Sequence, residues 1–327
     1  MADRKTVLLL PGQGAQRERM AAGLYGQQPE FTACVTRLVE GLGADGDRLA
    51  AAWLRTAPNP AIDEADTAQP LLLMVGFALG MALSAEGRAP DLLLGHSVGE
   101  LAAACLAGVF SRADIATVVT ARARVLGADG RGGMLVVAAA PGELPAIAEP
   151  GVSVAAVNGP RQCVLAGPSA ALQAVAASLR SAGLVARILK SDYAFHSAAM
   201  YPTAVRFRAE LSRVQLRAPR TTLISTRTGT PVSPRQAVDP AFWADQIRFP
   251  VQYWPALKAL LDSGPGVVLL DASADRSLTA GARHHPAVRS GASRIVPLLA
   301  PPRTTGGAAD AAAFAAALDS LAVPPVR

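Results

Sequence analysis

A short apolar run that ends in a glycine-flanked serine most constrains how this chain can fold. Residues 92–94 are three leucines, typical of a buried strand, and Gly95-His96-Ser97-Val98-Gly99 follows directly. Residues 100–107 then favour a helix. A strand, a tight glycine-containing turn and a helix form the nucleophile elbow of α/β-hydrolase-like domains, although a serine that merely caps the helix would use the same residues. The surrounding strand and helix favour the elbow.

Ser97 needs a base if it is to act as a nucleophile, and the chain has four histidines, at positions 96, 196, 284 and 285. His96 adjoins the serine in a turn that directs its side chain elsewhere. His196 lies in Tyr193-Ala194-Phe195-His196-Ser197, where an inserted unit returns to the main domain, and such crossings often border clefts. The alternative is a hydrogen-bonded structural histidine. His196 is the best candidate base.

Apolar runs and helical segments alternate through the larger part of the chain. Strands are predicted over residues 7–10, 92–94, 222–225 and 267–270, and helices over 31–42, 71–83, 198–211, 251–261 and 306–321. Continuous apolar runs of this kind are typical of parallel strands buried on both faces. The alternation therefore predicts a large α/β domain with a mostly parallel sheet, formed by residues 1–131 and 194–327.

Residues 132–193 show a different pattern and are expected to form a small inserted subdomain. Strands are predicted over residues 134–138, 152–157, 163–166 and 185–189, with helices over 143–147 and 170–181. This βαββαβ order matches a ferredoxin-like unit. The larger domain is therefore expected to be discontinuous in sequence.

Arg122 is a candidate ligand-binding residue. Ser111 and Asp114 resemble a capping box that opens a helix with Ile115 on its apolar face. At about 100° per residue, Arg122 lies within roughly 20° of Ile115, whereas Arg124 lies on the opposite side and is expected in solvent. A buried guanidinium needs an anionic partner, because an unpaired interior charge costs several kcal/mol. That partner is either a ligand carboxylate or an internal one.

Composition and charge argue against several other classes of protein. The net charge of +6 attracts polyanions, but no Lys/Arg run carries the interleaved aromatics that single-stranded nucleic-acid binding needs. Residues 71–83, the longest apolar run, are too short to cross a bilayer. Cys34, Cys105 and Cys163 form no C-x-x-C pair, and no signal-peptide pattern opens the chain. A cytoplasmic protein is expected.

Neither a dinucleotide site nor a metal site is expected. Gly12-Gln13-Gly14-Ala15-Gln16 follows the first predicted strand, but Arg17 stands where the dinucleotide fingerprint requires Gly or Ala. The adjacent His284 and His285 cannot easily direct both rings at one ion, and no Cys/His cluster accompanies them. The sequence therefore predicts no metal.

Taken in order, these segments resemble the malonyl-CoA:acyl carrier protein transacylase family and the acyltransferase domains of polyketide synthases. The resemblance covers almost the whole chain, and the ordered set of motifs is highly specific. The matching segments are Pro11-Gly12-Gln13-Gly14-Ala15-Gln16, Thr67-Ala68-Gln69-Pro70, Gly95-His96-Ser97-Val98-Gly99-Glu100, Val157-Asn158-Gly159-Pro160, Ala194-Phe195-His196-Ser197 and Phe249-Pro250-Val251. Arg122 stands at the spacing of the family's carboxylate-binding arginine.

The resemblance implies transfer of a malonyl group, or a related short carboxyacyl group, from coenzyme A to the phosphopantetheine thiol of an acyl carrier protein. It implies a ping-pong reaction in which Ser97 is the nucleophile and His196 the base. The other implied roles are an oxyanion hole from the backbone N–H groups of Gln13 and Val98, support of His196 by Gln246, and substrate binding by Arg122, Asn158, Tyr193 and Phe195. The coenzyme A thioester is a substrate, so no cofactor is implied.

Two segments depart from the family pattern. Synthase domains that choose malonyl resemble H-A-F-H and those that choose methylmalonyl resemble Y-A-S-H, whereas this chain has Tyr193-Ala194-Phe195-His196. Phe195 would narrow the pocket against an α-methyl branch, which favours malonyl by about 1 to 3 kcal/mol. Ser273-Ala274-Asp275 replaces the family's late G-P-G segment, with no functional account. The synthase-type motifs suit a discrete enzyme that serves a polyketide assembly line in trans, or an excised domain.

Three other functions are compatible with the sequence. An esterase or thioesterase would use Ser97, Asp271 and His284 in the hydrolase order, although Arg122 and the inserted unit argue against it. Transfer between two carrier proteins would use the same serine. A non-catalytic carrier-protein binder would keep the fold without the reaction, but Ser97, His196 and Arg122 are all present.

Overall fold

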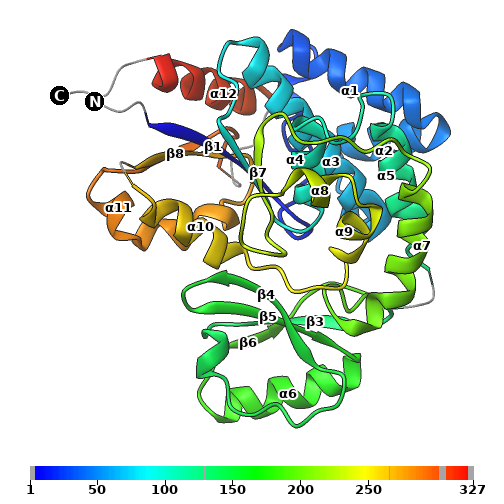
Figure 1. The fold of residues 1–327 in the computed structure, drawn as a ribbon, viewed down its shortest axis with the longest axis vertical. Helices are drawn as coiled ribbons and strands as arrows, with labels where there is room; N and C mark the ends of the chain where they lie inside the picture. Colours follow the sequence, from blue (N-terminus) through cyan, green and yellow to red (C-terminus); the bar gives the residue numbers. More distant parts are fainter. Residues whose placement is uncertain (1–3, 128–129, 265, 302–306, 323–327) are drawn as a thin grey trace.

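The computed structural model describes residues 4–127, 130–264, 266–301 and 307–322, which form a larger α/β unit and a smaller antiparallel one (Figure 1). The larger sheet is entirely parallel and has the strand order β7-β2-β1-β8-β9. Its strands are β1 Lys5–Leu10, β2 Leu92–Gly95, β7 Thr222–Ile224, β8 Val267–Asp271 and β9 Arg294–Pro297. The four predicted strands are confirmed, and β9 adds an edge strand that the sequence analysis missed.

Side chains of β1 alternate between the two faces of this sheet. Leu8 and Leu10 belong to the core cluster on one face, and Val7 and Leu9 belong to the cluster on the other. All four side chains are completely buried. The sheet is therefore covered on both faces, which is why β1 reads as a continuous apolar run.

Helices supply the two covering layers. Those whose apolar side chains join Leu8 and Leu10 are α1 Pro29–Leu42, α2 Ala44–Leu54, α3 Ala65–Ala85, α4 Val98–Leu106, α5 Ile115–Arg124, α7 Tyr201–Leu211, α8 Pro234–Ala237, α9 Pro240–Asp245 and α12 Gly307–Ala322. Those on the opposite face are α10 Tyr253–Asp262 and α11 Pro286–Arg289. The predicted helix over 306–321 corresponds to α12. Residue 306, at which the predicted helix begins, lies outside the described residues.

Helix α3 begins at Ala65, earlier than predicted, so Pro70 lies inside the helix and does not precede it. Its 21 residues are long and apolar enough to cross a membrane, which makes the sequence argument from length wrong. Its burial is what argues against a membrane span, because 83% of its most apolar window is enclosed by the protein. Helix α3 is a core helix of the larger unit.

The smaller unit is a four-stranded antiparallel sheet in the order β4-β5-β3-β6, at the lower end of the molecule in Figure 1. Its elements are β3 Gly133–Val137, β4 Ser153–Gly159, β5 Gln162–Gly167, α6 Ser169–Ser181 and β6 Ala186–Ile188. This is the strand order of a ferredoxin-like unit. The predicted helix over 143–147 is wrong, because a 3₁₀ turn over Pro141–Glu143 takes its place.

A short backbone pairing joins the two units near the end of β4. Val157 N–H donates to the Val251 carbonyl and Val251 N–H donates to the Ala155 carbonyl, each at 2.9 Å. The predicted helix over 251–261 therefore starts later, at Tyr253. The segment before α10 is held against the smaller sheet, and this arrangement places residues 246–251 beside the site described next.

Candidate active site

Ser97 occupies a sharp turn between β2 and α4. Strand β2 ends at Gly95 and α4 begins at Val98, so Ser97 is the N-cap residue, and its backbone φ of 52° and ψ of −123° are strained for a non-glycine residue. A side chain at Gly99 would collide with the Leu10 backbone. The loop after β1 and the turn after β2 can meet only because this position is glycine, and the predicted elbow is thus formed.

His196 contacts Ser97 directly, since its Nε2 lies 2.8 Å from Ser97 Oγ. Its Nδ1 lies 3.0 Å from the carbonyl oxygens of both Gln246 and Phe249. Carbonyl oxygens only accept, so Nδ1 carries the proton and Nε2 is left to accept the serine proton. Burial lowers the pKa of His196 to about 3, with smaller contributions from His96 and Arg122. The resting imidazole is neutral.

Gln246 connects the serine and the histidine through two different groups. Its side-chain Nε2 donates to the Ser97 carbonyl at 2.5 Å, whereas its backbone carbonyl accepts from His196. The sequence analysis expected Gln246 beside His196, and the structure places its main-chain oxygen there. Among the described residues, no carboxylate hydrogen-bonds His196.

Arg122 is buried on α5 with a relative exposure of 2%, whereas Arg124 is exposed, as the helical phase predicted. Its Nε donates to Gln69 Oε1 at 2.9 Å, and its guanidinium lies 5.6 Å from the centroid of the Phe207 ring. Both terminal nitrogens are buried and find no hydrogen-bond partner among the described residues. Burial lowers the pKa of Arg122 to about 9, which keeps the group cationic at neutral pH.

Gln69 and Gln13 extend this arrangement to the loop after β1. Gln69 Nε2 donates to Gln13 Oε1 at 2.9 Å. Val98 is the first residue of α4, so its N–H has no acceptor within the helix and remains available next to Ser97. The sequence analysis did not assign a role to Gln69, although the Thr67-Ala68-Gln69-Pro70 segment was a signal for it.

Asn158 already has a partner within the protein, because its Oδ1 is 2.8 Å from His96 Nε2. Since Oδ1 only accepts, His96 Nε2 carries the proton of that ring. Burial lowers the pKa of His96, so this imidazole is also neutral. A side chain at Gly12 would lie 2.7 Å from His96 Nδ1 and 3.0 Å from the Ser97 Cβ. The hydrogen bond between Asn158 and His96 therefore links β4 of the smaller sheet to the serine turn.

The rings of Tyr193 and Phe195 lie next to each other, tilted by 37°, in the segment that leads to His196. Their ring centroids are 5.3 Å apart, and Phe195 is buried in a small cluster with Met200 and Ile247. The Arg131 guanidinium lies 4.9 Å from the Tyr193 ring centroid. The contact of these two rings with the acyl group stays a prediction.

The alternative hydrolase triad is contradicted by the structure. Asp271 is fully buried and accepts from Ser273 N–H at 2.8 Å and from Thr279 Oγ1 at 2.7 Å. His284 is exposed, and Ser97 pairs with His196. The hydroxyl of Ser273 also donates to Asp271 at 2.5 Å. The unexplained Ser273-Ala274-Asp275 departure thus supplies a structural partner for a buried carboxylate.

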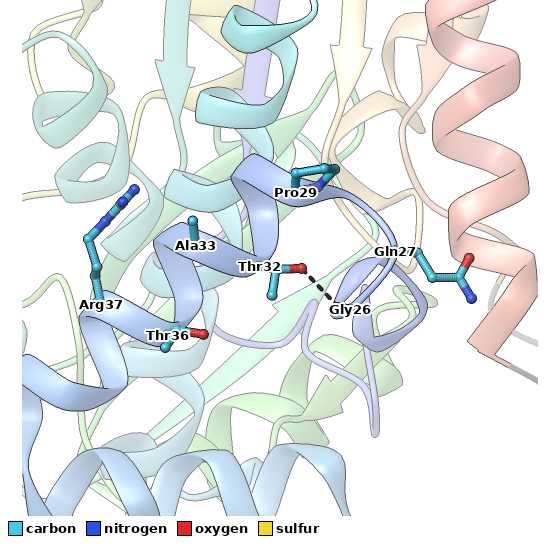
Figure 2. Close-up of a pocket in the computed structure, with 7 residues that line it drawn as sticks. All are labelled: Gly26, Gln27, Pro29, Thr32, Ala33, Thr36 and Arg37. Carbon is cyan, nitrogen blue, oxygen red and sulfur yellow. Dashed lines mark hydrogen bonds between the residues drawn. The ribbon is translucent and has the colours of Figure 1, made fainter.

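A pocket of about 560 Å³ lies elsewhere, at the N-terminal half of α1 (Figure 2). Two of its polar side chains have partners, because Gly26 N–H donates to Thr32 Oγ1 at 2.8 Å (Figure 2) and Arg37 pairs with Glu30 at 3.4 Å. The residues that line it are Gly26, Gln27, Pro29, Thr32, Ala33, Thr36 and Arg37. None of the predicted site residues is among them.

The parallel sheet, the serine elbow and the inserted antiparallel sheet define an acyltransferase of the α/β type. The sequence profile of the acyl transferase domain family matches residues 7–319, and the chain belongs to this family. It is therefore an acyltransferase, similar to those of polyketide synthases.

The comparisons with individual proteins agree with that assignment. A phenolphthiocerol/phthiocerol polyketide synthase of Mycobacterium tuberculosis (strain CDC 1551 / Oshkosh) is 37% identical over 286 residues, which cover 86% of this chain and 19% of that protein. The acyltransferase domain of SpnD, solved in complex with 2-(pent-4-yn-1-yl)malonyl, is 31% identical with a TM-score of 0.88, covering 98% of this chain and 77% of that one. Malonyl-CoA:acyl carrier protein transacylase of Xanthomonas oryzae pv. oryzae is 26% identical with a TM-score of 0.82, covering 98% and 99%. The chain thus spans about a fifth of the mycobacterial polyketide synthase that it matches.

Proposed function

We propose that this acyltransferase moves malonyl, or a related short carboxyacyl group, from coenzyme A to the phosphopantetheine thiol of an acyl carrier protein. The single observation that carries the proposal is the buried cationic Arg122, whose two terminal nitrogens lack a partner within the described residues. It is close enough to the catalytic pair for its charge to lower the pKa of His196. A carboxylate on the acyl group would satisfy both nitrogens at once.

In the first half-reaction, His196 Nε2 takes the proton of Ser97 as Oγ attacks the thioester carbonyl. The N–H groups of Gln13 and Val98 would stabilise the oxyanion, and Arg122 would hold the acyl carboxylate so that the carbonyl faces the serine. The C–S bond breaks, and coenzyme A leaves as a thiol with the proton from His196. The acyl group is then an ester of Ser97.

The second half-reaction reverses these proton transfers. The carrier thiol gives its proton to His196, its sulfur attacks the ester carbonyl, and Ser97 Oγ leaves with that proton. A thioester is already activated for acyl transfer, so the chemistry needs neither a metal nor a cofactor. We expect malonyl to be favoured over methylmalonyl, because the family motif predicts that Phe195 narrows the acyl pocket against an α-branch.

Two relatives support the substrate class. The SpnD domain was solved with a substituted malonyl group, and the Xanthomonas protein is a transacylase between malonyl-CoA and an acyl carrier protein. Similarity to polyketide synthases favours a place in polyketide assembly. For this chain, the carrier protein and the acyl group are proposals.

Intact-mass spectrometry tests this function. The wild type and Ser97→Ala are each exposed briefly to malonyl-, methylmalonyl- or acetyl-CoA. A malonyl adduct on the wild type alone, released by a phosphopantetheinylated carrier protein, is expected. Labelling by acetyl-CoA without labelling by malonyl-CoA would contradict the role of Arg122. An adduct that water removes as fast as the carrier does would indicate a hydrolase.

A further inference from the structure

Gln69 holds Arg122 in an orientation that the two side chains define together. Arginine nitrogens only donate, so the Gln69 Oε1 must face Arg122 and its Nε2 must face Gln13, as the two 2.9 Å hydrogen bonds show. Both ends of the Gln69 amide are thus used, and its relative exposure is only 3%. The side chain cannot turn over without losing a buried hydrogen bond.

Gln69 accepts from Nε, the inner nitrogen of Arg122, and leaves the two outer nitrogens available. Nη1 and Nη2 are both buried and unpartnered among the described residues. An amide also brings no charge, and burial is the sole cause of the shift in the pKa of Arg122. The cation is therefore fixed in place, and within the described part of the chain no carboxylate neutralises it.

We propose that Gln69 is a specificity-determining residue: its neutral amide positions Arg122 and keeps the guanidinium free, so that the acyl carboxylate is the group that neutralises it. This inference rests on the proposed function. A glutamate at position 69 would have nearly the same shape, but it would form its own charge-assisted pair with Arg122. The protein would then supply the carboxylate that it normally takes from the substrate.

The contact between Gln69 and Gln13 adds a second consequence. The backbone N–H of Gln13 belongs to the proposed oxyanion hole, and a carboxylate at position 69 cannot donate to Gln13 Oε1. The Gln13 amide would then have to turn over to keep this part-buried contact. The Gln69 side chain thus connects Arg122, which would bind the acyl carboxylate, to the loop that carries Gln13.

The test compares Gln69→Glu with the wild type in acylation by malonyl-CoA and by acetyl-CoA. We expect kcat/KM for malonyl-CoA to fall about 100-fold or more, because a buried charge pair to the substrate is lost. Acetyl-CoA carries no carboxylate, so its kcat/KM is expected to fall by less than about 10-fold, and the preference between the two donors shifts toward acetyl. An unchanged malonyl preference in Gln69→Glu would overturn the inference.

Gln69→Met supplies a second, independent test if the glutamate variant does not fold. Methionine is neutral and of similar size, so the variant is expected to lose rate through poorer positioning but to keep its preference for malonyl. If Gln69→Met loses that preference as completely as Arg122→Met does, neutrality is not the determinant and the inference is wrong.

Gln215→Glu is the matched control for replacing a glutamine beside an arginine with glutamate. Gln215 also accepts from an arginine, Arg217, at 2.8 Å, but both side chains are exposed. This control is expected to leave both rates unchanged. A wild type that forms no malonyl adduct would overturn the proposed function together with the inference, whereas a malonyl adduct with unaltered selectivity in Gln69→Glu would overturn the inference alone.

Discussion

His196 is held by two backbone carbonyls where many serine enzymes use a carboxylate. The oxygens of Gln246 and Phe249 fix the tautomer, because each accepts from Nδ1 at 3.0 Å. They carry no full negative charge, so they raise the pKa of His196 less than burial lowers it. The residue therefore combines a fixed orientation with a strong preference for the neutral form.

Removing this imidazole is expected to lower the rate of Ser97 acylation by about 10²- to 10⁴-fold, the usual contribution of a positioned general base. His196→Ala is compared with His284→Ala by stopped-flow measurement of acyl-enzyme formation. His284 is exposed, so its substitution is expected to leave the rate unchanged. Equal losses in the two variants would contradict the assignment of the base.

The depressed pKa of His196 also predicts how stability depends on pH. The unfolded chain binds a proton near pH 6.5, whereas the folded protein does so only near pH 3. The free energy of unfolding should therefore fall as the pH is lowered from about 6.5 toward 3. Urea titrations of the wild type and His196→Gln check this, since the variant should lose less stability over the same window. Parallel curves would contradict the shift.

At the scale of elements, the elbow depends on backbone-to-backbone contact between the β1 loop and α4. Gly99→Ala places a methyl group against the Leu10 backbone and is expected to destabilise the protein by about 1 to 3 kcal/mol. Gly142→Ala is the control, because no other atom lies within 4 Å of its Cβ position. Thermal unfolding measures both. A Gly99→Ala protein as stable as the control would show that the loop can move away.

The sequence predicted elements well where pattern and packing agree. Strand β1 and helix α5 were predictable because their apolar residues follow the geometry of a buried strand and of one helical face. The span over 143–147 was not, because isolated apolar residues there pack beside the sheet without a helical turn. Pro70 misled in the opposite sense, since tertiary burial of α3 compensates for a missing hydrogen bond.

Site residues were predictable from motifs, but their contacts were not. Ser97 and His196 were proposed from an elbow and a family motif, whereas the role of Gln69 needed the geometry of Arg122. The family motif placed Asn158 at the substrate, and its hydrogen bond to His96 came only from the structure. Side-chain partners separated by 50 or more residues, such as Gln69 and Arg122, depend on the whole fold and leave no local pattern.

At the scale of the whole molecule, the C-terminal helix is tied to the loop that carries Gln13. Asp310 on α12 is 5% exposed and lies 2.7 Å from an Arg17 nitrogen, just beyond that loop. It also accepts from the backbone N–H of Ala21 and Ala300 at 2.8 and 2.9 Å. One carboxylate thus joins α12 and the segment just before it to residues 17–21, which are distant in sequence.

Asp310→Ala is therefore expected to destabilise the protein by about 3 to 5 kcal/mol, because it leaves the Arg17 charge and two buried N–H groups unpaired. Asp45→Ala is the matched control, since Asp45 and Arg48 form an exposed pair at 3.9 Å that contributes about 0 to 1 kcal/mol. Urea unfolding gives both values. We expect acylation of Ser97 to slow in Asp310→Ala even under conditions where the variant stays folded, because α12 no longer holds the loop that carries Gln13. Unchanged acylation would show that this helix stabilises the fold without positioning the site.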